Sequence, residues 1–175
     1  MSATPPPADH DTRDWTFVVD DGCDECGYVP HDPATTSARL LAVVPRWAAA
    51  LQRPGVGERP APGVWSPLEY ACHARDLVRV LGERVGAVLA LEGAPFASYD
   101  GEAEAVRQEF WASDPQVVAR QIAEETERTV AVLDRVRGEA WERAGTRGDG
   151  APFTIAGLSR YLLHDVEHHL HDVGA

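Results

Sequence analysis

The residues best suited to chemistry are concentrated near the end of the chain, in the stretch LLHDVEHHLHDV that spans residues 162–173. Four of the protein's seven histidines lie within it, together with two aspartates. Imidazole nitrogens and carboxylate oxygens bind divalent metals, so this composition indicates a metal site. A polar helix end is the simpler explanation, because histidines near a helix C-terminus interact favourably with the helix dipole.

The spacing of the apolar residues predicts which of these side chains face the interior. An apolar stripe recurs at helical intervals through Ile155, Leu158, Leu162, Asp165 with Val166, His169 and Val173. Asp165 and His169 are one turn apart on this stripe, with Cβ atoms about 5–6 Å apart, close enough to bind one ion. The alternative pair, His164 and His168, has the same spacing but lies beside the stripe. His171 lies away from both pairs and is expected in solvent.

His73 is a third candidate ligand, and it belongs to a different predicted helix. Together with a chelating pair from the last helix, it would give three protein ligands and leave one coordination position open. That arrangement is typical of catalytic rather than structural metal sites. A divalent ion would also offset the cost of burying Asp165. Taken by itself, His73 is more simply a core histidine.

Cys23 and Cys26, in the run CDEC, have the C-x2-C spacing of half a tetrahedral zinc site. The other half is missing nearby in the sequence, and histidines such as His31 or His10 are candidates to complete it. A redox role is a second interpretation, although Cys23 does not begin an evident helix, which is a usual setting for a reactive thiol. A structural role without metal is a third.

Four amphipathic helices are predicted to position these residues. The second begins at Ser66, because Pro67 occupies its first position and Glu69 completes a capping box. Asp114 and Thr154 are the predicted N-caps of the third and fourth. The four predicted helices span residues 35–54, 66–93, 114–137 and 154–173. Helices of this length, with almost no strand signal, predict an all-α four-helix bundle.

The sequence before the bundle is predicted to form an N-terminal extension. Residues 1–14, rich in proline and aspartate, are predicted to be disordered. Residues 15–35 form an irregular extension that carries the two cysteines, in which WTFVV (15–19) is a short strand or an extended segment. The bundle itself is expected to occupy residues 36–175.

The composition excludes several classes of partner. The net charge is −12, and all sixteen basic residues are arginines. A surface this acidic repels nucleic acid and anionic membranes. No apolar run approaches the roughly 18 residues that cross a bilayer, and the N-terminus has no secretory signal. We therefore expect a cytoplasmic protein whose three cysteines are thiols or metal ligands.

The motifs around these residues resemble a known family. The run WSPLEYACH carries Trp65 and His73 near the start of the second helix, and the last helix ends in HHLHDV. This pattern resembles the DinB-like superfamily, which includes mycothiol-dependent maleylpyruvate isomerase and the bacillithiol transferases. The resemblance covers about residues 36–173 and implies an up-down-down-up four-helix bundle.

The resemblance also implies a metal site. Family members hold a divalent ion, commonly zinc or nickel, through one histidine of the second helix and an i, i+4 pair of the last. His73 matches the first position, and the second histidine of the terminal doublet is His169. Asp165 then stands where many members carry histidine and the isomerase carries an acidic residue. If His164 and His168 are used instead, the site consists of three histidines.

The function implied by the resemblance is that of a transferase or isomerase that uses a low-molecular-weight thiol as co-substrate. The metal would activate the thiolate, which would attack an electrophilic small molecule. Catalytic residues beyond the ligands are not identified. The alternatives are a metal-dependent hydrolase and a non-catalytic metal-binding or stress-related interaction protein. A homodimer is a further expectation.

Overall fold

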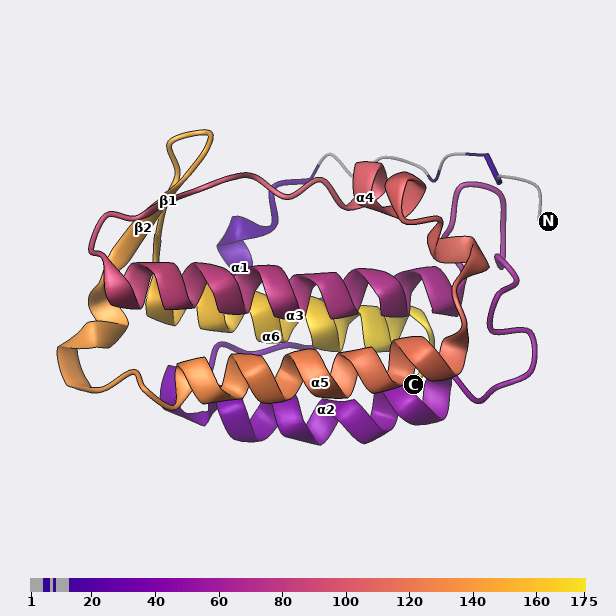
Figure 1. Cartoon of the computed structure of the whole chain (residues 1–175), viewed down its shortest axis with the longest axis horizontal. Helices are drawn as coiled ribbons and strands as arrows, with labels where there is room; N and C mark the ends of the chain where they lie inside the picture. Colours follow the sequence, from indigo (N-terminus) through magenta and orange to yellow (C-terminus); the bar gives the residue numbers. More distant parts are fainter. Residues whose placement is uncertain (1–4, 7, 9–12) are drawn as a thin grey trace.

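Four long helices form the body of the protein in the computed structural model, which describes residues 5–6, 8 and 13–175 (Figure 1). They are α2 (Thr36–Ala50), α3 (Pro67–Ala90), α5 (Pro115–Leu133) and α6 (Ile155–Asp172). The all-α four-helix bundle with an N-terminal extension is therefore confirmed. The disorder predicted for residues 1–14 concerns a segment that lies mostly outside the described residues.

The predicted N-caps begin three of these helices. The Ser66 hydroxyl accepts a hydrogen bond from the N–H of Glu69, and the Glu69 carboxylate accepts one from the N–H of Ser66, which completes the capping box of α3. The Asp114 carboxylate caps α5 by accepting the N–H groups of Gln116 and Val117, and the Thr154 hydroxyl caps α6 by accepting the N–H of Gly157. These starts are encoded locally, because each cap satisfies backbone N–H groups that the helix leaves unpaired.

The connections give the bundle its up-down-down-up order. Helix α3 packs against α5 and α6, and α2 packs against the same two helices. After α3 the chain returns along the outside of the bundle before α5 begins, so α3 and α5 run in parallel (Figure 1). This return segment, residues 91–114, contains β1 (Pro95–Phe96), α4 (Gly101–Arg107) and the 3-10 turn η3 (Phe110–Ala112).

The core lies between the four helices. Its largest fully buried side chains include Trp47, Phe110, Leu81 and Leu162. The apolar stripes predicted from helical spacing supply most of it. In the described part of the chain, no helix is long and apolar enough to cross a bilayer.

One prediction about the remaining segments was wrong. Residues 15–19 form neither a strand nor an extended segment: they belong to the 3-10 turn η1 (Trp15–Phe17) and the short helix α1 (Val18–Asp21). The Asp14 side chain caps η1 by accepting the N–H of Thr16. This tight turn buries Val18 completely, and α1 packs against α6, which a flat extended segment would not achieve.

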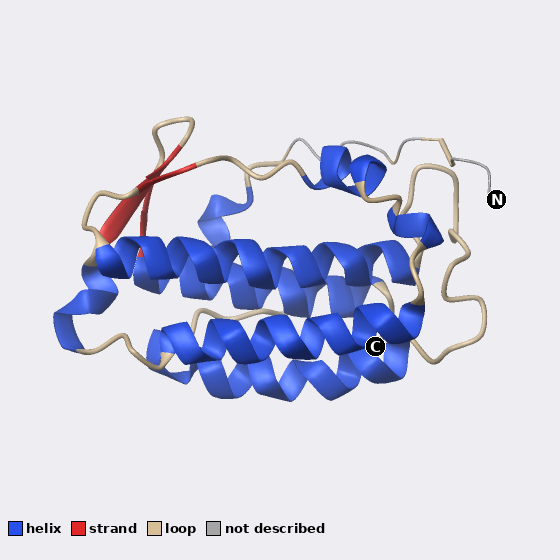
Figure 2. Cartoon of the chain, in the orientation of Figure 1, coloured by secondary structure: helices blue, strands red, loops and turns tan. Residues whose placement is uncertain are grey.

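The chain also contains a small sheet that the sequence did not predict (Figure 2). Strand β1 pairs in parallel with β2 (Ala144–Arg147), which pairs antiparallel with β3 (Pro152–Thr154). These strands are too short to show an alternating pattern, and they pair only because the return segment passes beside the loop that precedes α6. Two further 3-10 turns, η2 (Pro33–Thr35) and η4 (Gly138–Glu142), precede α2 and β2.

Candidate metal centre

A cavity of about 700 Å³ lies between α3 and α6, beneath the return segment. One face of each helix forms its walls, since the lining residues recur at helical spacing. On α3 these are Tyr70, His73, Leu77, Leu81 and Arg84, and on α6 they are Tyr161, His164, Asp165, His168, His169 and Asp172. The return segment and the N-terminal extension close the cavity with Tyr99 and Trp15. The volume is in the range of small-molecule sites.

Close packing, rather than hydrogen bonding, positions His73. Its Nδ1 is buried and has no hydrogen-bond partner among the described residues. The imidazole lies between Trp65 and Tyr99, with ring centroids 5.2 and 5.7 Å away. Gly101 permits this placement, because a Cβ at that position would lie 2.7 Å from Cε1 of His73.

The protonation state of His73 suits a ligand. Burial, with a smaller contribution from His169, lowers the pKa of His73 well below its ordinary value. The imidazole is therefore neutral near pH 7 and keeps a lone pair. A buried, neutral imidazole whose Nδ1 has no partner is costly in a closed protein core, and a bound metal would relieve that cost.

His169 faces His73 from α6. Their ring centroids are 5.1 Å apart, with the planes 71° from parallel. Nδ1 of His169 pairs with Asp172 Oδ2 at 2.8 Å. A carboxylate on one ring nitrogen orients the imidazole and leaves Nε2 for a ligand, as is usual for metal-binding histidines. Two imidazoles from two helices, with a carboxylate behind one of them, fit a divalent ion.

Asp165 lines the same cavity, but its contacts are with other residues than His73 and His169. Its Oδ1 lies 3.4 Å from Nδ1 of His164, and its charge is the first cause of the raised pKa of Tyr161, followed by burial. Within the described ranges, no converging set of three potential ligands includes Asp165. The structure thus brings His73 and His169 together and leaves Asp165 turned toward His164. The predicted ligand set of His73, Asp165 and His169 stays a prediction.

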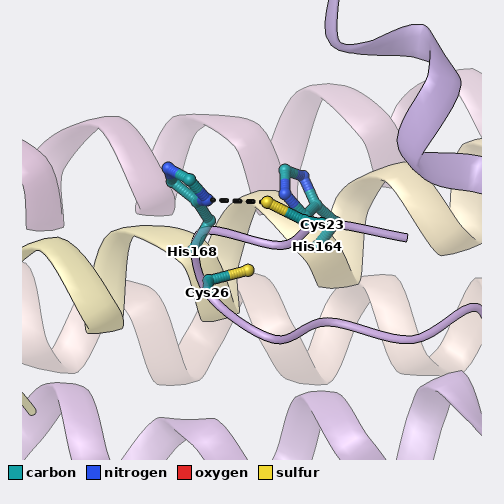
Figure 3. A group of neighbouring side chains, drawn as sticks. All are labelled: Cys23, Cys26, His164 and His168. Atoms are coloured by element: carbon teal, nitrogen blue, oxygen red, sulfur yellow. Dashed lines mark hydrogen bonds between the residues drawn. The ribbon is translucent and has the colours of Figure 1, made fainter. Parts of the chain in front are cut away.

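A second cluster lies next to this pair. Cys23, Cys26, His164 and His168 each offer one donor atom, and these atoms all lie within 4.8 Å of one another (Figure 3). Cys23 Sγ is 3.7 Å from Nδ1 of His168. All three cysteines of the chain are free thiols. His164 and His168, the alternative pair from the sequence, therefore converge with the cysteines.

A tight loop carries the cysteines to α6. Gly22 has a φ of +81°, and a Cβ there would lie 2.7 Å from the carbonyl oxygen of Tyr28, so the turn requires glycine. The N–H of Cys23 donates to that same carbonyl, and the N–H of Gly27 donates to the carbonyl of Cys23. The Tyr28 hydroxyl then donates to the carbonyl of Arg160 on α6. The loop is thereby fastened to the helix that carries the histidines.

His31, predicted as a candidate to complete the cysteine site, does not do so. Its Nδ1 lies 3.0 Å from the Tyr28 hydroxyl and its Nε2 lies 2.8 Å from Oγ1 of Thr36, so both ring nitrogens are engaged. His10, the other candidate, lies outside the described residues. His171 is exposed, as predicted, and belongs to neither cluster.

Sequence reasoning did not identify Arg84 and Arg147 as cavity residues. Arg147 forms an ion pair with Asp149 at 2.7 Å. Arg84 is half-buried and donates to the carbonyl of Ala97, but it has no acidic partner in the part of the chain described here. Only the helical register could have predicted that Arg84 lines the cavity, because Arg84 lies on the same face of α3 as His73.

Comparisons with known proteins agree with this architecture. Residues 54–173 match the model of the DinB superfamily. Among solved structures, the chain is similar to YfiT from Bacillus subtilis, named as a probable metal-dependent hydrolase with an unusual four-helix bundle topology. The TM-score is 0.71 at 18% sequence identity, over 84% of this chain and 91% of YfiT, which establishes a shared fold. No curated protein matches the chain.

Proposed function

This chain belongs to the DinB superfamily, and on that premise we propose that it is a metal-dependent transferase or isomerase that uses a low-molecular-weight thiol. One observation supports the proposal above others. His73, whose buried Nδ1 has no partner among the described residues, faces His169 of a second helix across the wall of a cavity that can hold a small molecule.

The residues around this pair suit a three-ligand site with an open position. His73 and His169 would be two ligands, and the second carboxylate oxygen of Asp165 would be the third, with Oδ1 still beside Nδ1 of His164. A zinc or nickel ion held there would supply Lewis acidity, which lowers the pKa of a thiol at neutral pH. Asp172 holds the His169 ring in place, and Trp65 and Tyr99 shield His73 from water.

The far end of the cavity favours an anionic substrate. Arg84 lies three turns along α3 from His73, about 16 Å at 1.5 Å per residue. Its guanidinium has no carboxylate partner among the described residues and stacks on Phe96 at 4.9 Å. A site with histidines at one end and, at the other, a guanidinium that has no carboxylate partner in the described part of the chain accommodates two joined substrates, a thiol and an electrophile that carries a carboxylate.

The test follows both thiol consumption, which reports transfer, and conversion of the electrophile, which also reports isomerisation with the thiol regenerated, on the metal-loaded full-length protein. Mycothiol, bacillithiol and glutathione would each be offered together with carboxylate-bearing electrophiles such as maleylpyruvate. We expect turnover with one thiol, abolished in His73→Ala and His169→Ala and retained in His171→Ala, an exposed histidine of the same helix. If His73→Ala keeps both full turnover and full metal content, the proposed site is wrong.

A hydrolase is the second candidate, because the structurally similar YfiT is named as a probable metal-dependent hydrolase. The same open position would then serve water instead of a thiol. Ester and amide substrates offered without thiol separate the two: turnover that is independent of any added thiol favours hydrolysis. Metal binding without turnover in either assay favours the non-catalytic alternative.

A further inference from the structure

We propose that Cys23, Cys26, His164 and His168 bind a structural zinc ion that fastens the N-terminal extension to α6. This site is separate from the His73–His169 pair and does not depend on the proposed function. Two thiolates and two imidazoles are a usual ligand set for structural zinc.

The distances between the donor atoms fit a tetrahedral ion. Zn–S bonds of about 2.3 Å and Zn–N bonds of about 2.0–2.1 Å place tetrahedral ligand atoms about 3.4–3.8 Å apart. Cys23 Sγ and His168 Nδ1 are already 3.7 Å apart, and the most distant pair among the four donor atoms is within 4.8 Å. Small changes in side-chain rotamer would bring all four onto one ion.

The environment of His164 points independently to a ligand. Its side chain is only 1% exposed, yet neither ring nitrogen makes a hydrogen bond with the described residues, and Nδ1 has only the ion-pair contact with Asp165 at 3.4 Å. Unsatisfied buried polar groups are rare and costly. A zinc ion would satisfy this imidazole. The assembled site would be neutral, because the two thiolates balance the ion's charge and their protons pass to solvent on binding.

Each histidine also has a carboxylate beside its other nitrogen. Nδ1 of His164 lies 3.4 Å from Asp165, which leaves Nε2 for the metal. Nε2 of His168 lies 3.7 Å from Asp172, while its Nδ1 faces Cys23. Carboxylates at these positions orient metal-binding imidazoles and fix their tautomers. In Figure 3 the two cysteines come from the loop and the two histidines from α6, and the four side chains converge.

The cysteine loop has the backbone that such a site needs. The N–H of Cys23 donates to the carbonyl of Tyr28 and the N–H of Gly27 donates to the carbonyl of Cys23, so one tight turn carries both cysteines. Gly27, directly after the second cysteine, has a φ of +75°, which reverses the chain there.

The zinc would also shape the cavity. Trp15, a lining residue, lies against both histidines, with ring centroids 5.6 Å from His164 and 5.0 Å from His168. Four protein ligands leave no open position, so the ion holds structure rather than substrate. Loss of the ion would release the extension, and with it one wall of the cavity.

Cobalt substitution of the full-length protein tests the site. We expect Co²⁺ to give d–d bands of a tetrahedral ion together with thiolate-to-cobalt charge transfer, and zinc to displace it. His73→Ala should keep this spectrum, because that histidine belongs to the other pair. Cys26→Ser should lose the charge-transfer band and about one equivalent of zinc per chain. Cys72→Ala, a buried cysteine outside the cluster, and His171→Ala are the matched controls.

A second variant guards against a folding defect in Cys26→Ser. Cys26→His replaces one donor by another, and we expect it to keep zinc while losing about half of the charge-transfer intensity. Hydrogen exchange would then show residues 15–31 opening on zinc removal while α5 stays protected. The proposal is overturned if the cobalt-loaded parent shows no thiolate band, or if Cys26→Ser retains both the band and its zinc.

Discussion

His168 and His169 are neighbours in sequence, yet their rings belong to different clusters. Successive residues on a helix point about 100° apart, so one imidazole faces the cysteine loop and the other faces His73. The exposed His171 shows a third direction on the same helix. The histidine-rich stretch therefore does not form a single site. Each histidine belongs to the cluster toward which its side chain points.

Gly101→Ala tests the placement of His73 without touching its chemistry. The added Cβ would lie 2.7 Å from Cε1 and 2.8 Å from Nδ1 of that ring, so the imidazole must move. We expect metal at the His73–His169 pair and turnover to fall at least about tenfold, because ligand geometry tolerates little displacement. Metal analysis and kinetics measure this. Gly148→Ala, which meets only ordinary contacts, is the control; equal losses in both variants would contradict the argument.

Arg84→Met tests the proposed carboxylate subsite. Methionine keeps an unbranched side chain but removes the guanidinium, so KM for a carboxylate-bearing electrophile should rise about 10–100-fold, the equivalent of one charged hydrogen bond. Metal content should not change. Arg79→Met, on the same helix but paired with Glu83 outside the cavity, should leave KM unaltered. An unchanged KM in Arg84→Met would exclude this subsite.

At the scale of helices, the start of α3 contains a charged pair that makes stability depend on pH. Burial alone would raise the pKa of Glu69, but hydrogen bonds from Arg59 and Ser66 outweigh it and lower the pKa below the ordinary 4.5. The stabilisation is therefore present above pH 4.5 and is lost as the pH falls through the folded-state pKa. The sequence revealed the cap of this helix but not its arginine partner.

Glu69→Gln should destabilise the protein by about 1.5–3 kcal/mol at pH 7, as expected for lost hydrogen bonds to a charged group. The difference should shrink as the pH drops below 4.5, because Glu69 is then protonated first in the unfolded chain and, at lower pH, in the folded one. Denaturant unfolding at several pH values measures this. Glu83→Gln removes an exposed pair on the same helix and should change little. A difference that stays constant with pH would contradict the linkage.

The contact of α3 with α5 depends on a glycine. A Cβ at Gly82 would lie 2.2 Å from Oγ1 of Thr129, whose hydroxyl donates to the carbonyl of Val78. Gly82→Ala should therefore cost about 1–3 kcal/mol by overpacking, despite the better helix propensity of alanine. Gly86→Ala, one turn along, meets Val132 at an ordinary 3.6 Å and should be neutral or stabilising. Thermal denaturation compares the two, and equal behaviour would refute the close approach.

At the scale of the molecule, metal and stability are coupled. A zinc ion that binds only the folded chain at 100 times its Kd adds about 2.7 kcal/mol. For a chain of this size we expect a chelator to lower Tm by about 5–10 °C, and zinc to restore it. Calorimetry of the parent and of Cys26→Ser measures this, and the variant should respond less. If the chelator leaves the Tm of the parent unchanged, the proposed structural zinc site is contradicted. The homodimer and the cytoplasmic location stay predictions.

The sequence by itself determined the helices, their caps and the faces they bury, because helical spacing and capping act over a few residues. It also identified the chemistry-bearing residues, and the DinB resemblance followed from them. Only the tertiary structure decided how those residues combine. Cys23 and His168 are 145 residues apart in sequence, and no local pattern links a loop to a helix at that distance.

The same reason explains the misplaced expectations. His31, close to the cysteines in sequence, is held by Tyr28 and Thr36, while distant histidines converge with the cysteines. The short strands and the guanidinium of Arg84 gain their roles from the return segment, whose path over α3 and α6 is set by packing. Interactions between residues close in sequence determined the helices of this protein. The burial of apolar surface between distant segments determined which of these elements pack together.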